Sequence, residues 1–258
     1  MAKPLMLITG GSQGIGAATA VLAAQRGYDI CFTYLNQKVA AQEIAKKIAA
    51  LDARALCVQA DVSKEADILN VFAQIDREFG RLDALVNNAG ILRQKLFRDT
   101  EVKELEQLFA INVIGSFICA REAIKRMSLA NGGEGGAIVN VSSIAARMGA
   151  PFEYIDYAAS KGAIDSFTIG LAKEVASEGI RVNAVSAGPI KTLAASGIAD
   201  FDKMIGFNEK HAALRRNVTI EEVGNASAFL CSDLASGITG EITYVDGGMN
   251  ITAAGTVD

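Results

Sequence analysis

One stretch near the amino terminus decides the fold: Leu5-Met6-Leu7-Ile8-Thr9-Gly10-Gly11-Ser12-Gln13-Gly14-Ile15-Gly16. Its first five residues are apolar or β-branched, which is typical of a buried strand. The glycine-rich loop leads directly into an alanine-rich stretch, residues 14–26, that we expect to be a helix. Backbone amides and the positive end of a helix dipole can hold a pyrophosphate at such a junction. The stretch therefore predicts a dinucleotide site in the first βα unit.

The same alternation of apolar runs and helical stretches continues along the whole chain. We expect strands at residues 5–9, 30–34, 55–60, 84–87, 137–142, 181–186 and 241–245. Runs of this kind suit a parallel sheet that is covered by helices on both faces. The predicted fold is a doubly wound, seven-stranded α/β sandwich of the Rossmann type. No repeat or linker interrupts it, so we expect a single domain over residues 1–258, with a substrate-binding loop at about 190–219.

The composition excludes several classes of protein. The chain has 258 residues, of which 50% are hydrophobic, 21% are charged and 3 are proline, so it is not intrinsically disordered. A net charge of -4 and the absence of tryptophan argue against nucleic-acid binding. We expect no membrane span, because the apolar run at residues 110–120 is too short. Four scattered cysteines and one histidine predict no metal site, and the lack of a secretory signal predicts a cytoplasmic location.

The carboxyl ends of the predicted strands supply further cofactor contacts, because a doubly wound sheet binds its ligand there. The residues that we expect to contact the cofactor are Gly10, Ser12, Gln13, Gly14, Ile15, Gly16, Tyr34, Asn36, Asp61, Val62, Asn88, Ala89 and Gly90. An acid after the second strand would bind the ribose 2'-hydroxyl of NAD and repel a 2'-phosphate. Residues 33–38 contain no acid, and Asn36 or Lys38 could contact the phosphate, so NADP(H) is favoured over NAD(H).

Tyr157 and Lys161 form the most informative pair, because residues four apart lie on one face of a helix. A neighbouring ammonium lowers the pKa of a phenol and stabilises the anion that remains after proton donation. The pair becomes specific when it is combined with Ser142 and Ser143 at the end of the fifth strand and with Asn112 in the preceding helix.

In order and approximate spacing, these motifs resemble the short-chain dehydrogenase/reductase family, and the resemblance spans almost the whole chain. It also includes Gly188-Pro189. The resemblance implies that Tyr157 donates the proton, that Lys161 binds the nicotinamide ribose, that Ser143 binds the substrate oxygen, and that Asn112 holds a proton-relay water. It also implies cofactor contacts at Pro189, Ile190 and Thr192. The interval from Ser143 to Tyr157 is one residue longer than in many members, so Ser142 is an alternative to Ser143.

From about Arg181 onward, the chain resembles a narrower group, the bacterial enoyl-acyl-carrier-protein reductases. The similar segments are residues 182–198 and 216–225. The first two thirds instead resemble 3-oxoacyl-acyl-carrier-protein reductases and other carbonyl reductases, which share the TGxxxGxG loop and the Tyr-x3-Lys spacing. Tyr154 lies seven residues before Lys161 and adds the Tyr-x6-Lys spacing of the enoyl group, so either tyrosine could be the acid. Alternatively, Tyr154 only packs near the helix start. The mixture suggests a natural mosaic or an engineered chimera.

The sequence predicts a NAD(P)H-dependent reductase of an acyl thioester, which acyl carrier protein could carry. Enoyl reduction is favoured over 3-oxoacyl reduction, and the alternatives are another carbonyl or alcohol dehydrogenase and a non-catalytic dinucleotide sensor. Residues 193–207 could form an apolar flap over the nicotinamide or an ordinary surface helix. Basic residues at 203, 210, 215 and 216 could attract an acidic carrier. The resemblance further implies a homotetramer built partly through long helices at 102–130 and 152–177.

Overall fold

A computed structural model of the chain describes residues 3–190 and 201–252. Seven parallel strands form one sheet in the order β3-β2-β1-β4-β5-β6-β7. The strands are β1 (Leu5–Ile8), β2 (Asp29–Tyr34), β3 (Ala55–Gln59), β4 (Ala84–Asn87), β5 (Gly136–Ser143), β6 (Ile180–Ala187) and β7 (Ile242–Val245). The predicted sheet is confirmed, and the strand ends lie within one residue of the sequence prediction.

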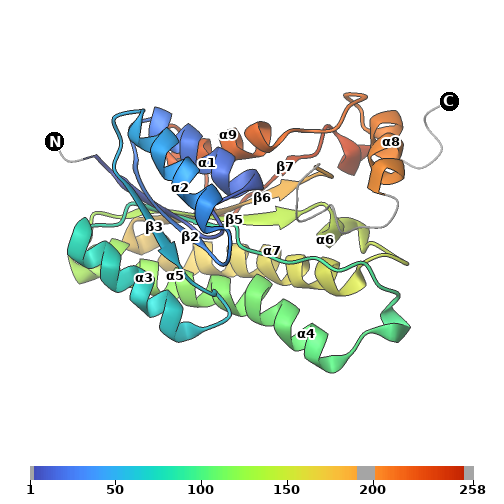
Figure 1. Cartoon of the computed structure of the whole chain (residues 1–258), viewed down its shortest axis with the longest axis horizontal. Helices are drawn as coiled ribbons and strands as arrows, with labels where there is room; N and C mark the ends of the chain where they lie inside the picture. The colour runs from blue at the N-terminus through green and yellow to red at the C-terminus, as the bar shows by residue number, and fades with distance from the viewer. Residues whose placement is uncertain (1–2, 191–200, 253–258) are drawn as a thin grey trace.

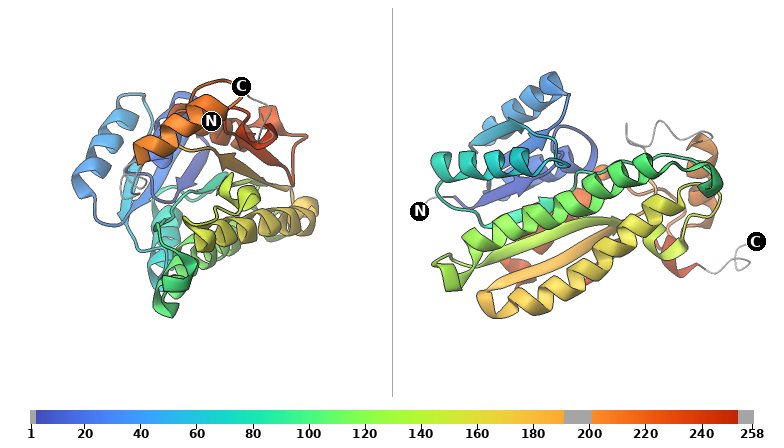
Figure 2. Two further views of the ribbon diagram at one scale, coloured as in Figure 1. Left: turned by 90° about the vertical axis from the view of Figure 1, so that its right-hand side faces the viewer. Right: turned by 90° about the horizontal axis from the view of Figure 1, so that it is seen from below.

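Helices cover both faces of the sheet and make three layers (Figures 1 and 2). One layer contains α1 (Gly14–Gln25), α2 (Lys38–Ala49) and α9 (Ile220–Cys231). The other contains α3 (Glu65–Glu78), α4 (Val102–Phe109), α5 (Gly115–Met127) and α7 (Ile155–Val175). The short α6 (Ala145–Met148) and α8 (Phe201–His211) lie beyond the carboxyl ends of the strands, on the right in Figure 1. Single 3-10 turns occupy Phe97–Asp99, Leu129–Asn131, Ala176–Glu178, Asp233–Ala235 and Met249–Ile251.

Two hydrophobic cores lie on opposite faces of the sheet, because alternate strand residues point to opposite sides. Ile8 and Val139 belong to the core beneath α1 and α9, whereas their neighbours Leu7 and Ile138 belong to the core beneath α3, α5 and α7. All four side chains are fully buried. Burial on both faces is the physical reason why these strands are continuously apolar instead of alternating.

The long helix expected at residues 102–130 is interrupted. A π-helical segment, Ala110–Ile114, joins α4 to α5, and α5 ends at Met127. Segments of this type insert an extra residue into a helix and often occur at functional sites. Asn112 lies in the middle of this segment, and directly after it Gly115 approaches the carbonyl oxygen of Val62 so closely that a Cβ would lie 2.6 Å from that oxygen.

Taken together, residues Val102–Met127 are long and apolar enough to cross a membrane by length and composition alone. Core helices of globular domains pass the same test when they are mostly buried. Here 44% of the apolar window is buried, and the stretch packs against α3, α7 and the sheet. The contacts with α3, α7 and the sheet account for the buried part of this apolar stretch.

The second long helix begins later than its sequence suggests. We expected it to start at Phe152, but α7 begins at Ile155 and ends at Val175. The backbone φ angles of Ala150 and Phe152 are +44° and +66°, which is the left-handed region and incompatible with a right-handed helix. The Ala150–Tyr154 segment therefore forms a separate turn in front of the helix that carries Tyr157 and Lys161.

Candidate active site

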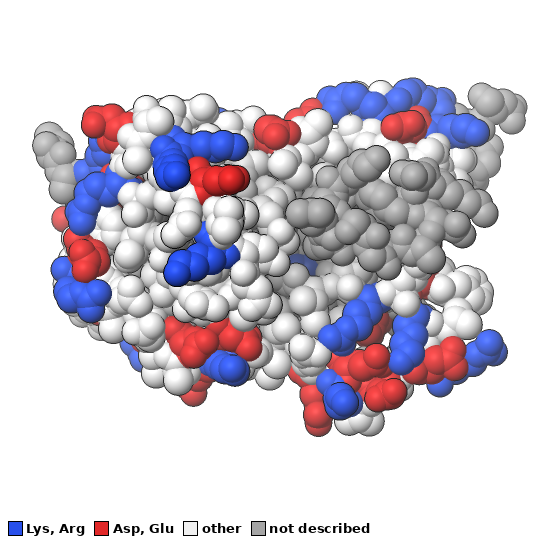
Figure 3. All heavy atoms as spheres, in the orientation of Figure 1, with Lys and Arg blue, Asp and Glu red and all other residues white. Residues whose placement is uncertain are grey.

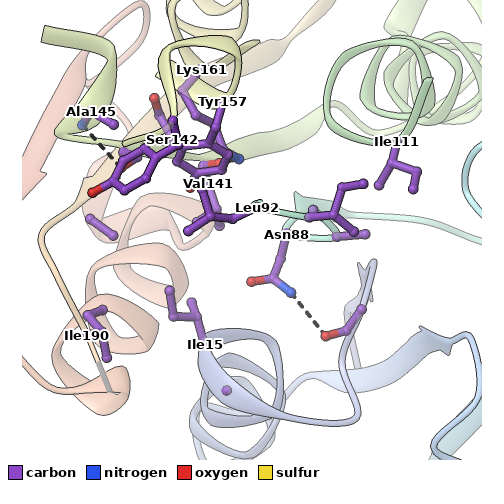
Figure 4. Close-up of a pocket in the computed structure, with 18 of the residues that line it drawn as sticks. Ile15, Asn88, Leu92, Ile111, Val141, Ser142, Ala145, Tyr157, Lys161 and Ile190 are labelled. Atoms are coloured by element: carbon purple, nitrogen blue, oxygen red, sulfur yellow. Dashed lines mark hydrogen bonds between the residues drawn. The ribbon is translucent and has the colours of Figure 1, made fainter. Parts of the chain in front are cut away.

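The carboxyl ends of the strands surround a cavity of about 560 Å³ (Figure 4). In the close-up, Tyr157 and Lys161 lie beside Val141 and Ser142, while Ile15 and Asn88 come from other elements across the space. The sequence-predicted residues that line the cavity are Gly10, Ser12, Gln13, Gly14, Ile15, Tyr34, Asp61, Val62, Asn88, Ala89, Gly90, Ser143, Tyr154, Tyr157, Lys161, Pro189 and Ile190. Gly16, Asn36 and Asn112 do not line it, and Thr192 lies outside the described residues.

The glycine loop makes the end of the cavity that fits a dinucleotide. Gly10 has a φ of +68°, and its amide donates to Thr33 Oγ1 at 3.0 Å. A Cβ on Gly16 would lie only 2.4 Å from the carbonyl oxygen of Gly10, so this position requires glycine. The amino end of α1 has no acidic residue in its first turn, and Gln13 at its N-cap makes no side-chain cap. The first amides of α1 are thus suited to hold an anionic pyrophosphate.

Asn88 fastens the glycine loop to the end of β4. Its Nδ2 donates to the carbonyl oxygens of Thr9 at 2.9 Å and Gly10 at 3.0 Å. In return, Thr9 Oγ1 accepts the backbone amides of Asn88 and Ala89, both at 3.0 Å. Asn88 therefore holds together two loops that both line the cavity.

The rim near the end of β2 differs in detail from the prediction. Leu35 and Gln37 line the cavity, whereas Asn36 between them is exposed and does not line it. At the end of β3, Asp61 accepts hydrogen bonds from the hydroxyl of Ser63 at 2.6 Å and from its amide at 3.0 Å. Burial acts to raise the pKa of Asp61, but these hydrogen bonds and Lys64 outweigh it, so the pKa lies below its usual value. Asp61 is therefore a charged carboxylate at the cavity wall.

Tyr157 and Lys161 meet at the other end of the cavity. Lys161 Nζ lies 5.6 Å from the centre of the Tyr157 ring and donates to the carbonyl oxygen of Val141 at 2.7 Å. Burial lowers the pKa of Lys161 to about 8, an effect that Asp165 opposes. Burial also raises the pKa of Tyr157, which Ser143 opposes. The expected lowering of the phenol pKa by the ammonium is thus not the dominant effect here; burial is, and it keeps the phenol protonated.

The structure distinguishes between Ser142 and Ser143. Both line the cavity, but only Ser143 acts on the pKa of Tyr157, and its Oγ accepts the amide of Ala145 at 3.2 Å. Ser142 is 2% exposed and sits on the face of β5 that is covered by α7. Ser143 is therefore the serine whose hydroxyl lies close to that of Tyr157.

Tyr154 lies in the same cavity as Tyr157. The two rings are 5.9 Å apart and nearly perpendicular, with Tyr154 at the N-cap of α7 and Tyr157 in its first turn. Burial raises the pKa of Tyr154 well above its usual value, and Glu153 raises it further. Both readings of Tyr154 from the sequence thus have structural support, because it packs at the helix start and also reaches the cavity.

The Asn112 side chain does not line the cavity but hydrogen-bonds the backbone of Ile91. Its Oδ1 accepts the amide of Ile91 at 2.8 Å, and its Nδ2 donates to the Ile91 carbonyl at 3.0 Å and to Ser160 Oγ at 3.1 Å. A Cβ on Gly90 would lie 3.3 Å from Asn112 Oδ1 and 3.8 Å from Lys161 Nζ. The π-helical segment therefore fixes the Gly90–Ile91 backbone directly beside Lys161.

The structure also adds cavity residues that the sequence did not single out. Apolar side chains form much of this wall, namely those of Leu92, Ile144, Met148 and Met249. Phe207, which also lines the cavity, lies at the end of the segment that the sequence predicted to be an apolar flap or a surface helix. Asn208 on α8 is 5% exposed, and its Nδ2 has no hydrogen-bond partner among the described residues. Nothing in the sequence distinguishes this asparagine from other helical polar residues. In the described part of the chain, no group of three His, Cys, Asp or Glu side chains could hold a metal ion.

Comparisons with known proteins agree with this geometry. Residues 10–250 match the family model described as enoyl-(acyl carrier protein) reductase. The chain is 46% identical to the uncharacterized oxidoreductase YgfF of Escherichia coli K12, over 95% of this chain and 99% of that one. It is 40% identical to the enoyl-[acyl-carrier-protein] reductase [NADH] FabI of Neisseria meningitidis, over 97% and 96% of the two chains. The similarity to a protein with the enoyl reductase name is therefore not confined to the segment after Arg181.

Solved structures show the same fold. A 3-ketoacyl-(acyl-carrier-protein) reductase from Brucella melitensis, complexed with NADH, has a TM-score of 0.88 at 32% identity and covers 96% of this chain and 98% of its own. A short-chain dehydrogenase from Burkholderia cenocepacia, in complex with NADP, has a TM-score of 0.87 at 32% identity with the same coverage. With the glycine loop, the strand order and the Tyr157–Lys161 pair in place, the chain is an oxidoreductase that belongs to the short-chain dehydrogenase/reductase family.

Proposed function

We propose that this protein is a NAD(P)H-dependent reductase of an acyl thioester and that a 2-enoyl thioester is its substrate. The observation that carries the proposal is one cavity that joins the glycine loop to Tyr157, Lys161 and Ser143. Two names among the matches, the family model and the Neisseria relative, belong to enoyl reductases and support the enoyl choice.

Tyr157 is the proposed proton donor. Burial raises the pKa of its phenol, so the hydroxyl is protonated at neutral pH and available for donation. When bound, the reduced nicotinamide supplies the hydride. Tyr157 hydrogen-bonds the thioester oxygen, where negative charge develops, and then protonates the product. Ser143 shares that oxygen, because its hydroxyl is close enough to Tyr157 to act on the pKa of the phenol.

Lys161 is proposed to bind the nicotinamide ribose and to stabilise the tyrosinate that remains. A pKa of about 8 leaves it mostly protonated at neutral pH, with its ammonium near the Tyr157 ring. Asn112 holds Gly90 beside the ammonium, so this backbone marks the floor of the ribose site. These assignments divide the cavity into a cofactor-binding half at the start of α1 and a half at α7 that carries the proposed proton donor.

The substrate side of the cavity suits an acyl chain. Leu92, Ile144, Met148, Phe207 and Met249 give it an apolar wall, which excludes water from the reacting atoms. In Figure 3, Lys and Arg side chains gather at the upper right, where Figure 1 places α8. The exposed residues Lys210, Arg215 and Arg216 follow in sequence there, although Arg216 is paired with Glu222 at 2.6 Å. We propose that this basic edge receives an acidic acyl carrier.

For the cofactor, the comparisons support a nicotinamide dinucleotide in general. The choice of NADP(H) over NAD(H) is proposed from the end of β2, where Leu35 and Gln37 line the cavity and no carboxylate is available to repel a 2'-phosphate. NADH appears in the names of two of the relatives described above, so a direct comparison of the two cofactors is required.

A 3-oxoacyl thioester is the second candidate substrate. The observation in its favour is the pairing of Ser143 with Tyr157, a pair that suits the carbonyl oxygen of a ketone, together with the 3-ketoacyl reductase among the structural neighbours. The test is oxidation of NADPH and of NADH by the purified protein with a 2-enoyl and a 3-oxoacyl thioester in parallel. Faster turnover of the enoyl substrate supports the proposal, faster turnover of the 3-oxo substrate selects the second candidate, and turnover of neither rejects both.

Three further features are proposed from the sequence: the location, the oligomeric state and the substrate-binding loop. We propose a cytoplasmic homotetramer, assembled partly through the layer of α4, α5 and α7, where Ile114, Phe117 and Ile169 leave apolar side chains partly exposed. We also propose that residues 190–219 form the substrate-binding loop. Of this range, 191–200 lie outside the described residues, whereas Phe207 and Asn208 on α8 line the cavity.

A further inference from the structure

Behind Lys161, on the side that faces the sheet, α7 carries a second charged residue. Asp165 follows Lys161 by one helical turn, and residues four apart lie on the same helix face. Lys161 is 5% exposed. Asp165 is half-buried, and its Oδ1 is enclosed without a hydrogen-bond partner among the described residues. A buried carboxylate oxygen in this state is costly, so it calls for a physical explanation.

Two serine hydroxyls lie opposite this face of α7. Ser142 on β5 and Ser186 on β6 are register partners, 2% and 1% exposed, and each Oγ is buried with no hydrogen-bond partner in the described structure. Asn140, two residues before Ser142 and therefore on the same face of β5, donates to Thr168 Oγ1 on α7 at 2.9 Å. Ser142 and Ser186 consequently face α7, and Ser142 lies close enough to Asp165 to lower the pKa of its carboxyl.

These three groups are chemically complementary. Hydroxyls donate and a carboxylate accepts, so Ser142 and Ser186 can both turn toward Asp165. Three unpartnered oxygens that face one another are more than a random set of buried polar atoms. Lys161 belongs to the same cluster, because its Nζ donates to the carbonyl oxygen of Val141, the residue before Ser142.

We propose that Asp165, held by Ser142 and Ser186, is a positioning residue that keeps the Lys161 ammonium charged and directed toward the end of β5 beside Tyr157. The proposal rests on the proposed roles of Tyr157 and Lys161. Asp165 itself does not line the cavity and acts only through Lys161.

The electrostatics around Lys161 agree with this role. Burial lowers the pKa of Lys161, and in the described part of the chain the charge that opposes this effect is that of Asp165. Burial raises the pKa of Asp165, and Ser142 and Lys161 both act to lower it. The cluster therefore stabilises the charged forms of Lys161 and Asp165, whereas burial alone favours their uncharged forms.

Other titratable groups near α7 are engaged elsewhere or uncharged. Arg147 of α6 lies over the ring of Tyr244 on β7, 5.8 Å from its centre. Glu104 of α4 is paired with Lys95 at 2.8 Å. Tyr154 and Tyr157 both have a raised pKa and are neutral near pH 7. On this side, β5 and β6 present the Ser142 and Ser186 hydroxyls, so among the described residues removal of Asp165 takes away the charge that opposes the burial of Lys161.

The test is Asp165→Asn, which preserves shape and removes the charge. Its matched control is Glu174→Gln, an exposed carboxylate on the same helix. Loss of Asp165 lowers the pKa of Lys161, so the alkaline decline of kcat/KM should move to lower pH by about one unit. At pH 8, a shift of the Lys161 pKa from about 8 to about 7 lowers the protonated fraction from about one half to about one tenth, so kcat should fall about fivefold with little change in KM. Asp165→Glu should restore part of this loss. A profile identical to that of Glu174→Gln would overturn the proposal.

A second measurement keeps the inference testable if the substrate assignment fails. The ionisation of Lys161 is followed by NMR in protein labelled with ¹³C at lysine Cε, and its resonance is identified by its loss in Lys161→Met. Asp165→Asn should titrate at lower pH than the wild type, and Ser186→Ala should move it in the same direction by less. An unchanged titration in a folded Asp165→Asn protein rejects the positioning role, whatever the substrate is.

Discussion

The Lys161 ammonium lies 5.6 Å from the centre of the Tyr157 ring, close enough for a cation–π contact and directed at the carbonyl of Val141. Both groups are deeply enclosed, so burial dominates their pKa values: it raises that of the phenol and lowers that of the ammonium. Burial thus moves the two pKa values apart, from ordinary values of 10.0 for the phenol and 10.5 for the ammonium to a raised pKa for Tyr157 and a pKa of about 8 for Lys161. The phenol therefore keeps its proton to a higher pH than the ammonium does.

Tyr157→Phe should abolish most of the reductase activity. It removes the proposed proton donor while leaving the ring that packs on Tyr154, so kcat should fall by about 10²- to 10⁴-fold with little loss of stability. Tyr154→Phe is the matched variant and should keep most of the wild-type kcat. The reverse pattern in steady-state kinetics would assign the acid to Tyr154.

Lys161→Met should make the protein more stable at neutral pH although less active. The pKa of Lys161 is about 8 in the folded chain against an ordinary value of 10.5. Below pH 8 the lysine is charged in both states, so folding carries the full cost of burying it. Between about pH 8 and 10.5 the unfolded state binds more protons, and wild-type stability rises with pH.

The variant should therefore gain about 1–2 kcal/mol at pH 7, after the lost hydrogen bond to Val141, and the gain should shrink as the pH rises through this window. Urea unfolding at several pH values measures it. Lys173→Met, an exposed position on the same helix, should show no such trend. An equal effect of both variants would contradict the burial argument.

Gly16→Ala should disturb the cofactor loop. The new Cβ would lie 2.4 Å from the Gly10 carbonyl oxygen and 2.5 Å from Asn88 Nδ2, so the loop must move. We expect a loss of about 1–3 kcal/mol in stability and at least about tenfold weaker cofactor binding by fluorescence titration. Gly170→Ala, in the interior of α7 with nothing within 4 Å, should instead gain up to about 1 kcal/mol and bind cofactor normally.

Leu35→Asp should shift the cofactor preference toward NADH. Leu35 lines the cavity just after β2, where a carboxylate would accept the ribose 2'-hydroxyl of NADH and repel the 2'-phosphate of NADPH. The ratio of kcat/KM values for NADPH and NADH should fall by about tenfold or more. Val39→Asp adds the same charge at an exposed position on α2 outside the cavity and should leave the ratio unchanged. Similar ratios in both variants would mean that the 2'-phosphate binds elsewhere.

Asn208→Leu should stabilise the ligand-free protein and weaken ligand binding. The buried Nδ2 of Asn208 has no partner among the described residues and lines the cavity, so a bound ligand is the natural acceptor. Without ligand, the apolar variant should unfold with a free energy about 1–2 kcal/mol higher than the wild type. With ligand, the KM of either the thioester or the cofactor should rise about tenfold, and this identifies the group that Asn208 binds. Unchanged values of both KM would mean that Asn208 contacts neither.

Much of this protein could be predicted from sequence because the deciding signals are local. A continuously apolar strand followed by glycines and an alanine-rich helix has one physical solution, a buried parallel βα unit, and the chain repeats it. The spacing of Tyr157 and Lys161 likewise fixes their shared helix face without any knowledge of the fold. The glycine loop, the sheet and the paired side chains were therefore determined by the sequence itself.

Tertiary structure decided the features that depend on residues far apart in the chain. No local pattern predicts the π-helical segment or the hydrogen bonds of Asn112 to the Ile91 backbone. Likewise, only the register of β5 with β6 places Ser142 beside Ser186. Burial, which no local pattern measures, made the pKa of Tyr157 rise where the adjacent lysine alone predicted a fall. Sequence therefore determined which groups the site contains, whereas the enclosing core determined their protonation states and partners.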